Sequence, residues 1–234
     1  MANPVLLNNV DHADLRVVLD RGAAYGDAVN QTMVFATEKG FEFELVAPQA
    51  GGEAFKQASP FGKMPGFKDG DFLISDSTAI ITYLDAIKSE PNLIPTEPKA
   101  RARTIWYEEY GDTIVAACSG TMFFNRIVSP RFFGRPGDLA AADEAQKTAF
   151  PKVADYLESV IPASGYLVED RFTLADIAVA SPFATASHAG CPLNPSTHPK
   201  AYGYIESILA RPAFAKLIVQ ETQALAATAQ REPA

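Results

Sequence analysis

The sequence predicts an α/β domain followed by an all-helical domain. Strand-like and helix-like segments alternate over residues 1–88, whereas strand patterns almost vanish over 98–234. The segment between them, extended to Pro98, holds three prolines in ten residues, a composition typical of a linker. We therefore expect the first domain at 1–88, the linker at 89–97 and the helical domain at 98–234.

The first domain is expected to follow the order β-α-β-(α)-β-β-α. Short apolar or alternating runs indicate the strands, and apolar residues at helical spacing indicate the helices. Asp69-Gly70 predicts a tight hairpin turn, and Ser77 is expected to cap the helix after it. Residues 1–14 form a possible extra arm. The expected segments are a strand at 15–20, a helix at 29–39, a strand at 41–47, a hairpin within 61–75 and a helix to residue 87.

The second domain is expected to contain helices only. They are expected at residues 97–128, 139–160, 173–187, 199–210 and 212–226. The first could bend at Gly111 or Gly120, and Leu139 is expected on the inward side of the second. Regular helical spacing predicts that the buried side of the first helix carries Ile105, Tyr110, Ile114, Ala117 and Phe124.

The chain is acidic, since 20 Lys and Arg residues against 28 Asp and Glu residues give a net charge of −8. An acidic chain is poorly suited to grip nucleic acid or anionic lipid, so neither is expected as a partner. The sequence does not begin with a secretory pattern and has no apolar run of the ~18 residues that span a membrane. With only Cys118 and Cys191, a cytoplasmic protein with reduced thiols is expected.

Several kinds of site are excluded because their motifs are missing. The sequence contains no glycine-rich phosphate loop, no dinucleotide-binding fingerprint and no nucleophile elbow of a serine hydrolase. Its histidines, His12, His188 and His198, are far apart and form no H-E-x-x-H motif. We therefore expect no metal.

Two blocks of sequence carry a resemblance to a known family. Residues 59–87 read SPFGKMPGFKDGDFLISDSTAIITYLDAI, and residues 165–183 read GYLVEDRFTLADIAVASPF. The first block resembles the glutathione-binding half of the cytosolic glutathione transferases, and the second resembles their helical-domain signature. The resemblance spans residues 15–225. It implies a thioredoxin-like N-terminal domain, an all-helical C-terminal domain, glutathione as a co-substrate and a homodimer.

The first block can also be interpreted physically, as an edge that binds a peptide. A cis bond before Pro65 would leave the backbone N–H and C=O of Met64 unpaired, so that an extended peptide could add as a short strand. Ser77 could bind the γ-glutamyl carboxylate of glutathione, and Asp76 its ammonium group. Alternatively, Ser77 only caps the helix and Asp76 only complements its dipole. The predicted glutathione-binding residues are Lys63, Met64, Pro65, Asp76 and Ser77.

The family resemblance implies a Ser, Cys or Tyr after the first strand that stabilises the glutathione thiolate. The matching loop, residues 21–30, contains no Ser or Cys, and its one hydroxyl belongs to Tyr25. Three interpretations stay open. Tyr25 donates to the thiolate, free N–H groups at the start of the next helix do so, or no turnover occurs.

The helical half contains two further groups of interest. Thr173 and Asp176 have the spacing of a capping box, which predicts a role in folding. Four other residues could line a pocket for the second substrate, although aromatic residues at helical spacing more often belong to a core. The four residues are Tyr107, Tyr110, Met122 and Phe123.

We predict a glutathione transferase that activates the glutathione thiol for attack on a small hydrophobic electrophile. The intact Met64-Pro65 and Asp76-Ser77 pairs favour an enzyme. The missing Ser or Cys favours an alternative, a non-catalytic interaction module with the same fold. A glutathione-dependent lyase or isomerase of this fold is a further alternative.

Overall fold

The computed structural model describes residues 15–18, 26–46 and 52–228. Within these residues, one four-stranded mixed sheet has the order β2-β1-β3-β4. β1 is parallel to β2 and antiparallel to β3, and β3 pairs with β4 in the predicted hairpin. The strands are β1 (Leu15–Val18), β2 (Glu44–Val46), β3 (Gly66–Asp69) and β4 (Phe72–Ser75).

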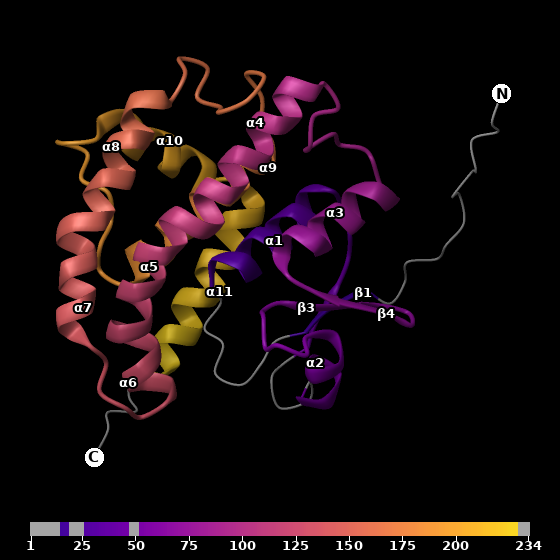
Figure 1. Ribbon diagram of the computed structural model, residues 1–234, viewed down its shortest axis with the longest axis horizontal. Helices are drawn as coiled ribbons and strands as arrows, with labels where there is room; N and C mark the ends of the chain where they lie inside the picture. The colour runs from indigo at the N-terminus through magenta and orange to yellow at the C-terminus, as the bar shows by residue number, and fades with distance from the viewer. Residues whose placement is uncertain (1–14, 19–25, 47–51, 229–234) are drawn as a thin grey trace.

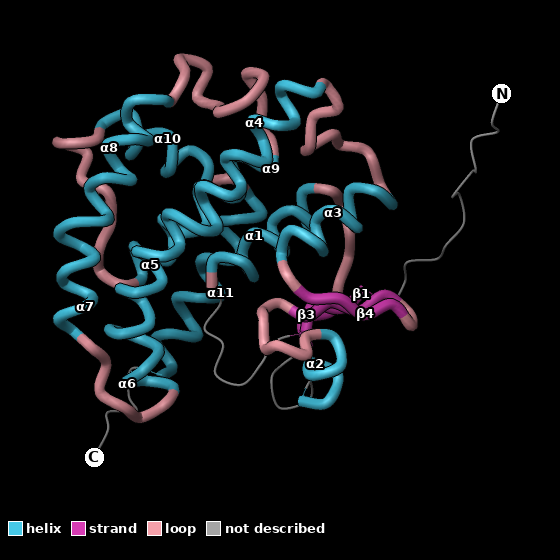
Figure 2. The backbone as a smooth tube through the Cα atoms, viewed as in Figure 1, coloured by secondary structure: helices cyan, strands magenta, loops and turns pink. Residues whose placement is uncertain are grey.

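Three helices complete the first domain: α1 (Asp27–Glu38), α2 (Gly52–Ala58) and α3 (Ser77–Ile87). α1 and α3 cover one face of the sheet, and α2 lies on the other (Figure 2). The core between the sheet and the two helices contains the fully buried Phe35, Phe67 and Ile80. This arrangement confirms the thioredoxin-like fold. The predicted arm at 1–14 lies outside the described residues.

The second domain is helical, as predicted, and its described residues contain no strand. α9 packs against α1 of the first domain and against α4 and α5 of its own (Figure 1). Three of its segments, labelled η, are π-helical. The segments are α4 (Pro98–Glu109), η1 (Tyr110–Val115), α5 (Ala116–Phe123), η2 (Phe124–Val128), α6 (Ser129–Phe132), α7 (Leu139–Glu144), η3 (Ala145–Ala149), α8 (Phe150–Val160), α9 (Leu174–His188), α10 (Pro199–Leu209) and α11 (Pro212–Thr228).

The π-helical turns explain an error in the predicted buried side of the long helix. Each hydrogen bond of a π-helix spans one residue more than in an α-helix, so the side chains that follow are rotated. Tyr110 is buried as predicted, but Ile114 and Phe124 are about half-exposed, while Val115 and Met122 are buried. The predicted buried side was therefore wrong from Ile114 in η1 onward, and Ala117 is exposed as well.

Leu139 is also exposed, although it was expected on the inward side of its helix. It is the first residue of α7, and the buried part of α7 begins one turn later, at Ala142. The helix thus projects beyond the packed surface at its start.

Close packing within the helical domain and one ion pair to the first domain fix the position of α9 and α11. A side chain at Gly111 would place its Cβ 2.4 Å from the Ala178 carbonyl oxygen, so only glycine lets η1 approach α9 this closely. Arg211 at the start of α11 binds both carboxylate oxygens of Glu38 in α1, at 2.8 and 3.1 Å. Among the described residues, no helix is long and apolar enough to cross a membrane.

Candidate functional site

The turn before β3 presents backbone groups without partners. The Met64-Pro65 peptide bond is cis, as predicted. The N–H and C=O of Met64 make no hydrogen bond with any described residue, because pairing with β4 begins at Gly66. The Pro65 carbonyl accepts a bond from the Asp76 N–H at 3.3 Å and so holds this turn beside the start of α3. A peptide bound to Met64 would therefore lie next to the first turn of α3.

Asp76, rather than Ser77, is the N-cap of α3, so the predicted capping role of Ser77 is wrong. Oδ1 of Asp76 accepts bonds from the N–H groups of Thr78 at 3.1 Å and Ala79 at 3.4 Å. Its Oδ2 lies 2.8 Å from Nζ of Lys63. The φ angle of Asp76 is 85°, a conformation that costs a non-glycine residue about 1–3 kcal/mol. Such strained residues cluster at ligand sites.

Ser77 is buried at the first position of α3, yet its polar groups are free. Neither its N–H nor its hydroxyl bonds to another described residue. A free N–H and hydroxyl at a helix N-terminus can bind a carboxylate, because the helix dipole favours negative charge there. The bonds of Asp76 to Lys63 and Pro65 thus bring the five predicted residues to one end of the sheet.

The helical domain contributes three carboxylates that the sequence analysis missed: Glu108, Glu109 and Asp112. Burial raises the pKa of Asp112, and the charges of Asp76 and Glu109 raise it further. The site is therefore acidic on the side of the long helix, which favours a ligand ammonium group there. In the sequence, the cluster of three acidic residues within one and a half helical turns was the pattern that could have indicated this acidic side of the site.

Comparisons with known proteins agree with this geometry. Residues 24–86 match the sequence model of the glutathione S-transferase N-terminal domain, and residues 121–212 match that of the C-terminal domain. The chain is 31% identical over 205 residues to a glutathione S-transferase of Hyoscyamus muticus, an alignment that covers 84% of this chain and 95% of that protein. The chain belongs to the glutathione S-transferase family.

Two further relatives support this assignment. Glutathione S-transferase 3 of Zea mays is 31% identical over 189 residues, covering 77% of this chain and 84% of that protein. A glutathione S-transferase structure from Rhodospirillum rubrum F11 superposes with a TM-score of 0.77 at 22% identity, covering 87% and 91% of the two chains. The structure supports the fold, and the curated relatives named glutathione S-transferase confirm the predicted glutathione transferase function.

The predicted thiol-stabilising loop is described only from Gly26, which is the N-cap of α1. Gly26 supplies no capping side chain, and the N–H groups of Asp27 and Ala28 bond to no described residue. Burial raises the pKa of the Asp27 carboxyl to about 6. The hydrogen bond that this carboxyl accepts from the Ser119 hydroxyl acts in the opposite direction and lowers the pKa. Tyr25 lies outside the described residues.

The four residues predicted to line the second-substrate pocket are all between 0% and 7% exposed. The Tyr110 hydroxyl donates to the Val153 carbonyl at 2.8 Å, which satisfies it inside the helical domain. This placement matches the alternative interpretation, in which these side chains belong to the core. The residues are Tyr107, Tyr110, Met122 and Phe123.

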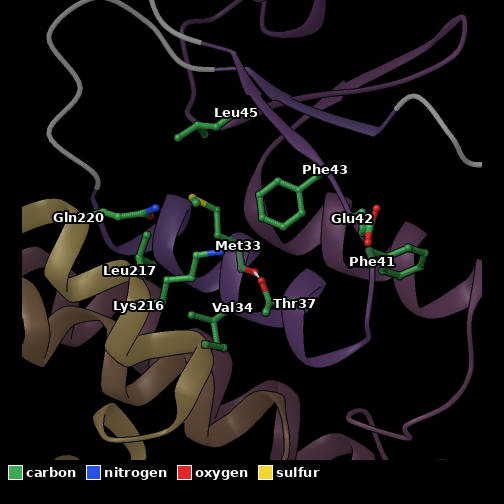
Figure 3. A pocket seen from close by; sticks show the side chains of 11 residues that line it. Met33, Val34, Thr37, Phe41, Glu42, Phe43, Leu45, Lys216, Leu217 and Gln220 are labelled. Atoms are coloured by element: carbon green, nitrogen blue, oxygen red, sulfur yellow. Dashed lines mark hydrogen bonds between the residues drawn. The ribbon is translucent and has the colours of Figure 1, made fainter.

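A cavity of about 360 Å³ lies elsewhere in the transferase, between α1, β2 and α11. Figure 3 shows Met33, Phe43 and Leu217 around it, with Lys216 and Gln220 at its edge. No residue of the predicted glutathione site lines it. Among the described residues, no cluster of three His, Cys, Asp or Glu side chains is placed to hold a metal ion.

Proposed function

We propose that glutathione binds along the turn before β3 and the first turn of α3. The cysteinyl backbone pairs with the free N–H and C=O of Met64, and Pro65 holds that turn. The γ-glutamyl carboxylate binds the N–H and hydroxyl of Ser77, and its ammonium group binds Asp76. Lys63 pairs with the Asp76 carboxylate and so adds a positive charge to this end of the site. The observation that carries the proposal is that the N–H and C=O of Met64 and the N–H and hydroxyl of Ser77 have no hydrogen-bond partner in the part of the chain that the structure describes.

The glutathione thiol then lies toward the start of α1 and attacks a small hydrophobic electrophile. A free thiol has a pKa near 8.5, so a stabilising group is needed for appreciable ionisation at neutral pH. The free N–H groups of Asp27 and Ala28 support stabilisation by the α1 N-terminus. Donation from Tyr25 stays a prediction, which Tyr25→Phe would test through the thiol pKa of the complex.

Replacement of Ser77 by Ala should weaken glutathione binding about tenfold, since one bond to a charged carboxylate is lost while the backbone N–H remains. Isothermal titration calorimetry with glutathione measures this directly. Ser159→Ala is the matched control, because the Ser159 hydroxyl bonds only to the Tyr156 carbonyl on an exposed face of α8. An unchanged dissociation constant for Ser77→Ala would refute the proposed carboxylate site.

We also propose a homodimer in which Phe61 packs against a second copy of the chain. Phe61 lies two residues before Lys63 and is 96% exposed, more than any other large apolar side chain among the described residues. Phe61→Ser should therefore shift the protein toward the monomer in sedimentation equilibrium. Phe133→Ser, which alters another exposed phenylalanine beyond α6, should leave the association constant unchanged. If the two variants had the same association constant, the proposed role of Phe61 in the homodimer would be contradicted.

The proposed domain division remains 1–88, 89–97 and 98–234. It is supported by the end of α3 at Ile87 and the start of α4 at Pro98. A cytoplasmic location is proposed with it, since Cys118 and Cys191 are buried and unpaired.

A further inference from the structure

Glu108 is a buried carboxylate that connects two helices of the first domain, α1 and α3, to the helical domain. It lies in α4 and is 0% exposed. Its Oε1 accepts a hydrogen bond from the Thr78 hydroxyl in α3. The same oxygen accepts a second hydrogen bond, at 3.4 Å, from Nε2 of Gln31 in α1. Its Oε2 is buried and has no hydrogen-bond partner among the described residues. No described cation forms an ion pair with this carboxylate, and a buried carboxylate is costly to keep without one, which calls for a functional explanation.

The bond to Thr78 falls at the proposed γ-glutamyl site. Thr78 follows Ser77 directly, and its own N–H donates to Asp76. The first turn of α3 is therefore held from two sides, by Asp76 through the backbone and by Glu108 through the Thr78 side chain. Ser77 lies between these two anchors, which fix its backbone and therefore the direction of its N–H.

We propose that Glu108 is a positioning residue that holds the first turn of α3, and with it Ser77, in place to bind the γ-glutamyl carboxylate of glutathione. This inference rests on the glutathione site proposed above. Gln31 extends the same contact to α1, so the helical domain sets the position of the γ-glutamyl site relative to the helix that faces the thiol. Burial raises the pKa of Glu108, while the bonds from Thr78 and Gln31 oppose that rise.

Thr78→Val tests the proposal, because valine keeps the shape of threonine and removes only the donor. The dissociation constant for glutathione should rise about fivefold, the effect of one lost hydrogen bond. The thiol pKa of the bound glutathione should stay the same, since α1 is untouched. Thr78→Ser keeps the hydroxyl and should bind glutathione within about twofold of the original protein.

Two further variants separate positioning from stability. Thr82→Val removes a hydroxyl one turn later that donates only to the Thr78 carbonyl, and it should leave glutathione binding unchanged. The double variant Thr78→Val with Glu108→Leu removes both groups of the Thr78–Glu108 bond and so avoids an unpaired buried carboxylate. Because Nε2 of Gln31 then loses its acceptor, the comparison is made on affinity and not on stability. The double variant should bind glutathione no more weakly than Thr78→Val.

The results distinguish the two proposals. If Ser77→Ala weakens binding and Thr78→Val does not, the role of Glu108 is overturned while the site stands. If neither variant weakens binding, both are overturned. A lowered affinity in Thr78→Val that is accompanied by a changed thiol pKa would also overturn the positioning role, because the effect would then reach beyond the γ-glutamyl end.

Discussion

Asp176→Ala should lower the free energy of unfolding by about 3–5 kcal/mol, the largest loss we expect from one substitution. Asp176 is 0% exposed. Its Oδ1 accepts from the Leu167 N–H at 3.0 Å and the Tyr204 hydroxyl at 2.9 Å, and its Oδ2 accepts from the Thr173 N–H at 2.9 Å. Alanine would leave these buried donors without partners and remove the Asp176 half of the capping box of α9, the helix on which both domains pack.

Urea unfolding followed by circular dichroism measures this loss. Glu144→Ala, at an exposed position of α7, is a suitable control and should change the unfolding free energy by less than about 0.5 kcal/mol. A loss below about 1 kcal/mol for Asp176→Ala would show that the capping box is not central to the helical domain.

Asp27→Asn should stabilise the protein at pH 7.5 by up to about 3 kcal/mol and by almost nothing at pH 4. In the folded protein burial raises the pKa of Asp27 from 3.8 to about 6, so the folded state retains a proton that the unfolded chain has lost. The wild-type protein therefore loses stability as the pH rises from about 4 to about 6, and the full cost persists above that range. Asparagine does not titrate and avoids this cost.

The unfolding free energy of the two proteins, measured in urea between pH 4 and pH 8, tests this prediction. The difference should grow between pH 4 and pH 6 and then stay constant. Glu144→Gln, which neutralises an exposed carboxyl, should give a curve parallel to that of the original protein. A stability difference for Asp27→Asn that is the same at every pH would exclude an ionisation effect.

Local sequence signals predicted the elements that depend on neighbouring residues. Asp69-Gly70 set the hairpin between β3 and β4, and Met64-Pro65 marked the turn before it. Thr173 and Asp176 predicted the capping box of α9 at the correct position. These features are stabilised by bonds between residues at most a few positions apart, so spacing alone reveals them.

Features that depend on packing between distant segments were missed or misplaced. The π-helical turn η1 rotates the buried side of the long helix. The spacing of Ile105 and Tyr110 in the sequence did not predict this turn. Glu108 was overlooked because its partners, Thr78 and Gln31, are 30 and 77 positions away. The helical spacing of Tyr107 was consistent with a pocket and with a core. Only its burial in the structure distinguishes these two interpretations.

The sequence by itself determined the family, the two-domain fold and the residues proposed to bind glutathione, because short motifs in fixed order encode them. Only the tertiary structure showed that Asp76 rather than Ser77 caps α3, that Ser77 is left free, and that Glu108 anchors the turn on which both lie. The physical reason is that a hydrogen bond across the domain interface depends on how the helices cross. Residue spacing along one segment does not contain that information.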